Sequence, residues 1–173
     1  MKTLIRIFFL LAVVFTGLNT ASGQSSKKER QAAKTAEIKK MVDAGNYVFK
    51  ANYANPMRGG QRTLTSEYDL KVSKDTIAAF LPYFGRAYVA PTDPTKGGIE
   101  FTCTNFDYTT KQAKNGNWDI VIKPKDKNLN EMTDVQSMRL SVTASGYASL
   151  SVTSSNRDAI TFEGYIEKVK GRD

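Results

Sequence analysis

The sequence contains no histidine and only one cysteine among its 173 residues, and these two shortages exclude several classes of function. Without histidine the chain cannot build a Ser-His-Asp triad, a Cys-His pair or a histidine-ligated zinc or haem site. With Cys103 alone it cannot form an intrachain disulfide, a four-cysteine metal site or a CxxC redox pair. Cys103 lies in an alternating strand pattern, so we expect it to be a small buried hydrophobic residue rather than a reactive thiol.

The first 23 residues have the layout of a cleaved secretory signal. Lys2 and Arg6 form a short positive region, an apolar run follows at 7–18, and Ala21-Ser22-Gly23 places small residues at the cleavage site. The apolar run is shorter than the ~20 residues that a spanning helix needs. We therefore expect an exported chain that begins at Gln24 and keeps no transmembrane anchor.

The predicted organisation has three parts: a signal peptide at 1–23, a basic helix at 24–45 and one β-rich domain at 46–173. Removal of the signal lowers the formal charge from +8 to +6, because the signal contains two basic residues and no acidic one. Between Lys27 and Lys40 the helix carries six basic and two acidic residues, so most of the positive excess lies there. We interpret this charge as a solvated helix face, with only Ile38, Met41 and Val42 positioned to pack.

After Gly45 the pattern changes from helical to alternating. The strand positions that we expect to share one face are Tyr47, Phe49, Ala51 and Tyr53 in a first strand, Leu64, Tyr68, Leu70 and Val72 in a second, and Trp118, Ile120 and Ile122 in a later one. Asn115-Gly116 predicts a hairpin. We further predict a short helix over Ser73–Leu81 and a β-bulge near Thr104-Asn105, where the alternation shifts by one residue.

This pattern predicts an α+β fold: a curved antiparallel sheet of about seven strands with an N-terminal helix. The sheet forms either a partly closed barrel or a two-sheet sandwich, and the alternation alone does not separate the two.

A family resemblance comes from Tyr68–Tyr88, above all from the run Leu81-Pro82-Tyr83-Phe84-Gly85-Arg86-Ala87. With Gly97-Gly98-Ile99, Trp118-Asp119-Ile120 and the block 153–157, the chain resembles domain-of-unknown-function family 4251, exported proteins of Bacteroidetes. The resemblance covers nearly all of the chain after the signal. It implies export from a Gram-negative cell, to the periplasm, the outer membrane or the medium, and it brings no known activity.

The segment around Gly85 is the candidate ligand-binding site, with Tyr83, Phe84, Arg86 and Tyr88 as its contact residues. Aromatic rings beside an arginine fork suit a carboxylate, a phosphate or a sugar ring. A structural interpretation competes with this one. In it the aromatic rings close the end of the sheet, Gly85 takes a backbone conformation that other residues avoid, and Arg86 pairs with Glu163 or Asp107.

No catalytic residue, metal site or cofactor is predicted. The acidic residues that lie on predicted strands are most simply outward-facing charges; these are Glu67, Asp69, Asp107, Asp119 and Glu163. The stretch 126–134 matches the start of a calcium loop, but Glu131 replaces the required glycine. Nucleotide-binding signatures and nucleic-acid-binding motifs are absent.

The sequence thus favours an exported, non-enzymatic domain that binds an unknown envelope ligand or protein on its curved sheet. Two alternatives stay open: a hydrolase of envelope carbohydrate that uses two carboxylates, and a structural envelope component that pairs through an exposed strand edge.

Overall fold

A computed structural model describes residues 20–89, 97–113, 116–125 and 135–169. Most of the predicted signal peptide, the stretch tested as a calcium loop and Asn115 lie outside these ranges. One helix, α2 (Thr20–Ala44), precedes nine strands, which in chain order are β1 (Tyr47–Pro56), β2 (Arg62–Val72), β3 (Ile77–Leu81), β4 (Ile99–Cys103), β5 (Phe106–Gln112), β6 (Trp118–Pro124), β7 (Val135–Val142), β8 (Tyr147–Ser154) and β9 (Ile160–Glu167).

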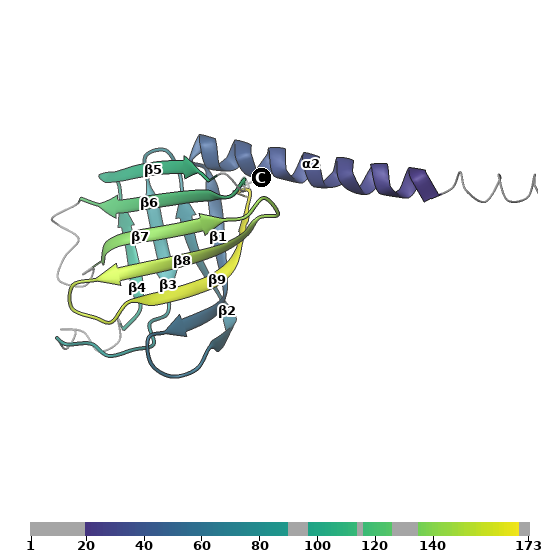
Figure 1. Cartoon of the computed structure of the whole chain (residues 1–173). Coiled ribbons are helices and arrows are strands. Elements are labelled where there is room, and N and C mark those ends of the chain that lie inside the picture. The colour runs from purple at the N-terminus through teal and green to yellow at the C-terminus, as the bar shows by residue number, and fades with distance from the viewer. Residues whose placement is uncertain (1–19, 90–96, 114–115, 126–134, 170–173) are drawn as a thin grey trace, which may run out of the picture.

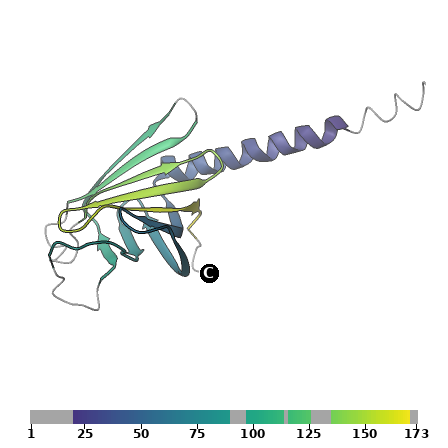
Figure 2. The ribbon, with the colours of Figure 1, turned by 60° about the horizontal axis from the view of Figure 1, so that its bottom comes forward.

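All nine strands form one antiparallel sheet in the order β4-β3-β2-β1-β9-β8-β7-β6-β5. The sheet curls into a nearly closed barrel in which β5 to β9 cross in front of β1 to β4 (Figure 1). The two halves diverge toward the edge strands (Figure 2). The predicted fold class is therefore confirmed, with nine strands instead of about seven, and the sheet takes the barrel form of the two that were predicted.

The alternating positions fill the space between the two halves. Leu70, Val72, Trp118, Ile120 and Ile122 are all buried, as their spacing predicts. No polar or charged residue among those that the structure describes belongs to the buried class. Cys103 is buried and free, which agrees with its interpretation as a small core residue. The barrel interior is a packed core, and a binding site must therefore lie on its outer face or at its ends.

Only the C-terminal part of α2 packs on the barrel, as the positions of its apolar residues predict. Ile38, Met41 and Val42 are buried, whereas residues 26–34 are exposed. The helix projects well beyond the sheet (Figure 1). It ends at Ala44 and is followed by Gly45, whose φ of 56° is easily reached by glycine.

Three local predictions are wrong. The stretch 73–81 is not a helix: Ser73 and Thr76 close a hairpin turn, with Ser73 N 2.9 Å from Thr76 O, and β3 pairs with β2. Side chains of β3 alternate between the two faces of the sheet, so Ile77, Ala79 and Leu81 are buried and Phe80 is exposed. The pairing of this segment with β2 decides its structure, although the spacing of its apolar residues is also compatible with a helix. Tyr53 does not share the face of Phe49, since a register shift between Ala51 and Tyr53 turns it outward and buries Ala54 instead.

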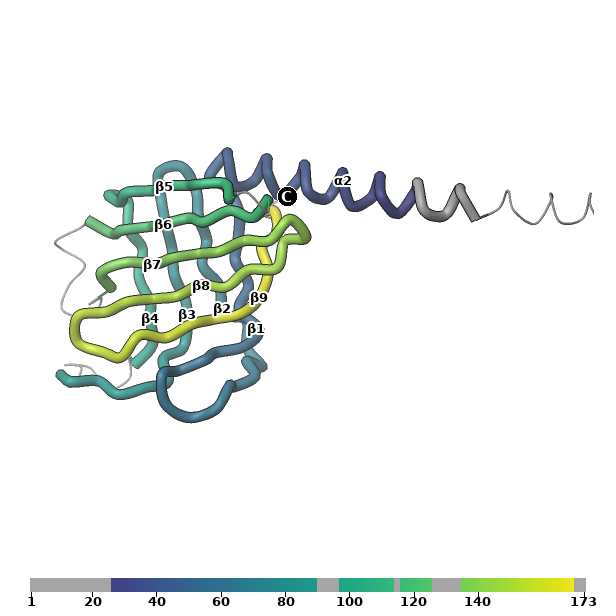
Figure 3. The backbone as a smooth tube through the Cα atoms, in the orientation of Figure 1, coloured from purple at the N-terminus to yellow at the C-terminus, as the bar shows by residue number. Residues whose placement is uncertain are grey.

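The third correction concerns Thr104-Asn105, which forms a corner rather than a bulge. The chain passes there from β4, at one edge of the sheet, to β5, at the other, and the two strands are not paired (Figure 3). A corner of this kind explains the change of parity, because the apolar side chains of β4 and β5 belong to different halves of the sheet. The predicted hairpin is confirmed by the β5–β6 pairing and by Gly116, whose φ is 82°.

Candidate functional site

The segment that carries the predicted site lies across the end of the barrel away from α2 (Figure 1). Backbone hydrogen bonds fasten it to the turn between β8 and β9. Tyr88 N donates to Asn156 O at 2.8 Å, Asp158 N donates to Arg86 O at 3.0 Å, and Ala87 forms an isolated bridge with Arg157. Main-chain contacts therefore hold the segment in place independently of its side chains.

Tyr83 and Phe84 are half-buried and pack against the core. The Tyr83 hydroxyl donates to the carbonyl oxygens of Arg86 at 2.9 Å and Asp158 at 3.1 Å. Its ring is covered by the guanidinium of Arg157, 4.9 Å from the ring centroid. Tyr83 thus joins the segment to the β8–β9 turn, which agrees with the structural interpretation for this residue.

Arg86 and Tyr88 are exposed, and 61% of Tyr88 is open to solvent. The Arg86 guanidinium lies 5.8 Å from the centre of the Tyr88 ring, and the Tyr88 hydroxyl donates to the Asp158 carboxylate. That hydrogen bond raises the pKa of Tyr88 above its ordinary value, although the charges of Arg86 and Arg58 oppose the shift. Asp158 therefore holds the Tyr88 side chain in place.

A further arginine completes the surface. Arg62, at the start of β2, lies 4.8 Å above the Phe84 ring. We define the arginine–aromatic cluster as three ring–guanidinium pairs, namely Phe84 with Arg62, Tyr83 with Arg157 and Tyr88 with Arg86. Each pair lies within the ~6 Å at which a cation is attracted by a ring face.

Two details of the structural interpretation are wrong. Gly85 does not have a positive φ; a side chain is excluded because a Cβ there would lie 2.6 Å from the Tyr83 hydroxyl. Arg86 pairs with neither predicted carboxylate, since Asp107 contacts Lys125 at 2.6 Å and Glu163 accepts from Asn55 at 3.0 Å.

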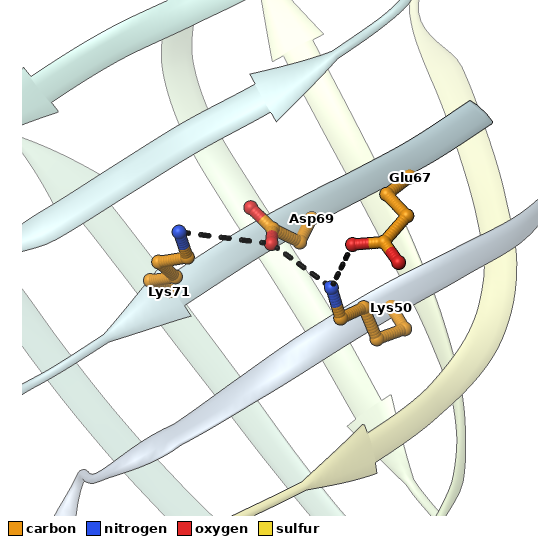
Figure 4. A network of polar contacts seen from close by, with 4 residues as sticks. All are labelled: Lys50, Glu67, Asp69 and Lys71. Carbon is orange, nitrogen blue, oxygen red and sulfur yellow. Dashed lines mark hydrogen bonds and ion pairs between the residues drawn. The ribbon is translucent and has the colours of Figure 1, made fainter. Parts of the chain in front are cut away.

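The remaining acidic residues face outward and are matched by cations. Lys50 Nζ lies 3.2 Å from Asp69 and 3.4 Å from Glu67, and Lys71 lies 3.9 Å from Asp69 (Figure 4). Burial lowers the pKa of Lys50, but the hydrogen bonds and charges of Asp69 and Glu67 outweigh it and the pKa is raised. The ammonium lies between the two carboxylates, where a hydrolase would need its substrate.

A hollow of about 510 Å³ lies over the outer faces of β5, β6 and β7. Two of its cations lie opposite carboxylates in the register, Lys111 opposite Asp119 and Lys123 opposite Asp107, and Arg139 is a third cation of the lining. In the described part of the chain, no three side chains of the metal-binding types lie close enough together to hold an ion. Among the same residues no helix has the length and apolar character needed to cross a membrane.

Arg62 and Arg157 were not among the predicted site residues, because they reach the site from β2 and from the β8–β9 turn. A second hollow, of about 360 Å³, lies on the outer face of β7, β8, β9 and β1 and was not predicted either. The sequence could indicate an exposed tyrosine on a strand, such as Tyr147, but only the order of the strands in the sheet shows which exposed residues lie together.

The fold and this surface define a class of protein: a single nearly closed antiparallel barrel, with an N-terminal helix and a packed interior. A family model for a domain of unknown function, DUF4251, matches residues 29–166. The chain belongs to this family. A crystal structure of a DUF4251 family protein from Bacteroides eggerthii DSM 20697 is similar, with a TM-score of 0.56 and 17% identity. The match covers 80% of this chain and 91% of that one, and at this identity it shows the fold alone. No curated protein matches the chain.

Proposed function

We propose that this protein is an exported, non-enzymatic binding domain that contacts an anionic ligand or partner through Tyr83, Phe84, Arg86 and Tyr88. The observation that carries the proposal is the arginine–aromatic cluster. Arg62 and Arg86 are exposed and lie against aromatic rings, and the Asp158 carboxylate accepts a hydrogen bond from the Tyr88 hydroxyl.

Carboxylates and phosphates are the groups that such a surface recognises. Arginine forks bind both in two-point fashion, and stacking on a ring holds the fork in place before the ligand arrives. The packed interior and the cation between Glu67 and Asp69 favour surface binding over hydrolysis.

The test is a binding titration with two anionic probes, trigalacturonic acid for carboxylates and purified lipopolysaccharide for phosphates. We expect at least one to bind, and Arg86→Ala and Tyr88→Ala each to weaken the affinity about tenfold. Binding should also weaken as salt is raised, because screening reduces the attraction between exposed charges. Lys111→Ala is the matched control, since it removes an exposed cation from a different face. If Arg86→Ala and Tyr88→Ala bind both probes as tightly as the unaltered protein, the proposal is wrong.

Export rests on the layout of residues 1–23 and is tested separately. We expect the protein to be recovered from the periplasm or the outer-membrane or culture fraction of a Gram-negative host, with Gln24 as its first residue. A product that keeps Met1 and stays in the cytoplasm would contradict it.

A further inference from the structure

The hollow of about 360 Å³ on the outer face of the barrel combines two exposed tyrosines with a row of hydroxyl groups. It lies over β7, β8, β9 and β1, and it therefore spans the junction between the two halves of the sheet. We call it the tyrosine groove and define it by Tyr53, Ser141, Tyr147, Ser149, Glu163 and Gly164, which are among its lining residues.

The strand register places four of these side chains in a line. Ser141 is the register partner of Ser149, Ser149 of Glu163, and Glu163 of Tyr53. Ser141 and Ser149 alternate with buried residues, and Glu163 and Tyr53 are exposed, so all four side chains lie on the outer face. Four neighbouring strands make the line about 14 Å long, since adjacent strands lie ~4.8 Å apart. The groove is therefore an elongated feature that crosses the strands.

The floor of the groove is made of small residues. Ala148 and Gly164 are register partners, and a Cβ at Gly164 would lie 1.8 Å from Lys50 O, so no side chain can be present there. Tyr53 lies at the β1 end of the line and Tyr147 lies two residues before Ser149 on β8, with 40% and 68% of their surfaces exposed. Their rings offer flat apolar faces beside hydrogen-bonding groups.

Glu163 provides the charge of the groove and has a defined orientation. Its carboxylate accepts from Asn55 Nδ2 at 3.0 Å and from Gln61 Nε2 at 3.4 Å. No lysine or arginine is among the lining residues, so an anion meets an unfavourable negative charge here. The groove and the arginine–aromatic cluster thus have opposite charge preferences.

The geometry points to a second binding site, for a neutral oligosaccharide, in the tyrosine groove. The C–H face of a sugar ring packs on an aromatic ring, and sugar hydroxyls bond with serine hydroxyls and donate to a carboxylate. A line of such groups across four strands suits a short chain of rings. This site does not depend on the anionic site proposed above, and its ligand class is different.

The experiment is isothermal titration of the full chain after the predicted signal with four neutral trisaccharides: cellotriose, maltotriose, mannotriose and chitotriose. We expect at least one to bind with a Kd of about 1 mM or below. Tyr147→Ala and Glu163→Gln are each expected to weaken that binding about tenfold. Phe80→Ala is the matched control, because it removes an exposed aromatic ring, 48% exposed, from β3 and outside the groove, and it is expected to change the Kd by less than about twofold.

Each result decides the proposal. The proposal is wrong if none of the four sugars binds at a concentration of about 10 mM, ten times the expected Kd. It is also wrong if Tyr147→Ala binds the sugar as tightly as the unaltered protein. Binding of trigalacturonic acid that depends on Tyr88 and not on Tyr147 would support two separate sites with opposite charge preferences, whereas loss of that binding in Tyr147→Ala would contradict them. Unfolding midpoints of the variants, followed by Trp118 fluorescence, show whether a loss of binding reflects a loss of fold.

Discussion

Replacing Gly164 by alanine tests how tightly the two halves of the barrel are joined. Gly164 lies on β9 opposite Ala51 of β1, and this strand pair connects the β1–β4 half to the β5–β9 half. A Cβ at this position would lie 1.8 Å from Lys50 O, 2.9 Å from Lys50 C and 3.2 Å from Ala51 Cα. All three are backbone atoms, so no side-chain rotation relieves the clash and the strands must separate.

The magnitude follows from two effects. Forcing extra volume into a packed position costs about 1–3 kcal/mol. Each ladder hydrogen bond lost as the strands separate costs about 1 kcal/mol more. We therefore expect Gly164→Ala to lower the free energy of unfolding by about 3 kcal/mol or more, a large share of the 5–15 kcal/mol of a typical domain.

The assay is urea unfolding followed by the fluorescence of Trp118, the one tryptophan of the chain, which is 1% exposed. Gly60→Ala is the matched control. It makes the same chemical change in an exposed loop, where nothing lies within 4 Å of the new Cβ and the φ is not positive. We expect that variant to stay within about 0.5 kcal/mol of the unaltered protein. A difference of less than 1 kcal/mol between the two variants, about a third of the expected loss, would refute the close approach of β1 and β9.

Three further predictions concern the helix, the core and the surface. Ile38→Ala empties a buried contact of α2 with the barrel and is expected to cost about 2–4 kcal/mol in urea unfolding, while Glu37→Ala on the exposed side stays within about 0.5 kcal/mol. The pKa of Tyr47 is raised well above its usual value, mainly by burial and further by Tyr108. The folded chain therefore holds the hydroxyl proton of Tyr47 more tightly than the unfolded chain does. The contribution of Tyr47 to the free energy of unfolding is then fully present below about pH 10 and is lost as the pH rises above that value. Urea unfolding midpoints measured between pH 8 and 11 check this. The midpoint of Tyr47→Phe is expected to fall less steeply with pH than that of the unaltered protein. Lys50→Met breaks a partly buried ion-pair network, in which the side chains of Lys50 and Asp69 are 22% and 13% exposed, and is expected to cost about 1.5–3 kcal/mol, with the difference from the unaltered protein shrinking in 1 M salt; a cost that salt does not change would contradict the electrostatic origin.

Much of the fold follows from alternation along the chain. Trp118, Ile120 and Ile122 are spaced by two and all face the core, as do Leu70 and Val72. Alternation fails where tertiary pairing decides. The run 77–81 is compatible with a helix by spacing, and it becomes a strand because the turn at 73–76 brings it against β2.

The candidate site could be predicted only in part. Arg86 and Tyr88 stand close together in the sequence, and the structure leaves both exposed beside each other. The partners Arg62 and Arg157 come from distant segments, and no local pattern links them to Phe84 and Tyr83. The tyrosine groove could not be predicted from the sequence, because it depends on the register of four strands. It also depends on the register shift in β1 between Ala51 and Tyr53, which turns the Tyr53 side chain outward.

The order of the strands also has a consequence for how fast the barrel forms. Among the described strands, every pairing except β1–β9 joins neighbours along the chain, so each half is a meander of local hairpins. Such contacts close short loops and form early, whereas β1–β9 must bring together two ends of the domain. We expect the entropy of that single closure to set the folding rate. A bond that tied residue 48 to its register partner at residue 167 would therefore accelerate folding far more than any hairpin improvement within a half.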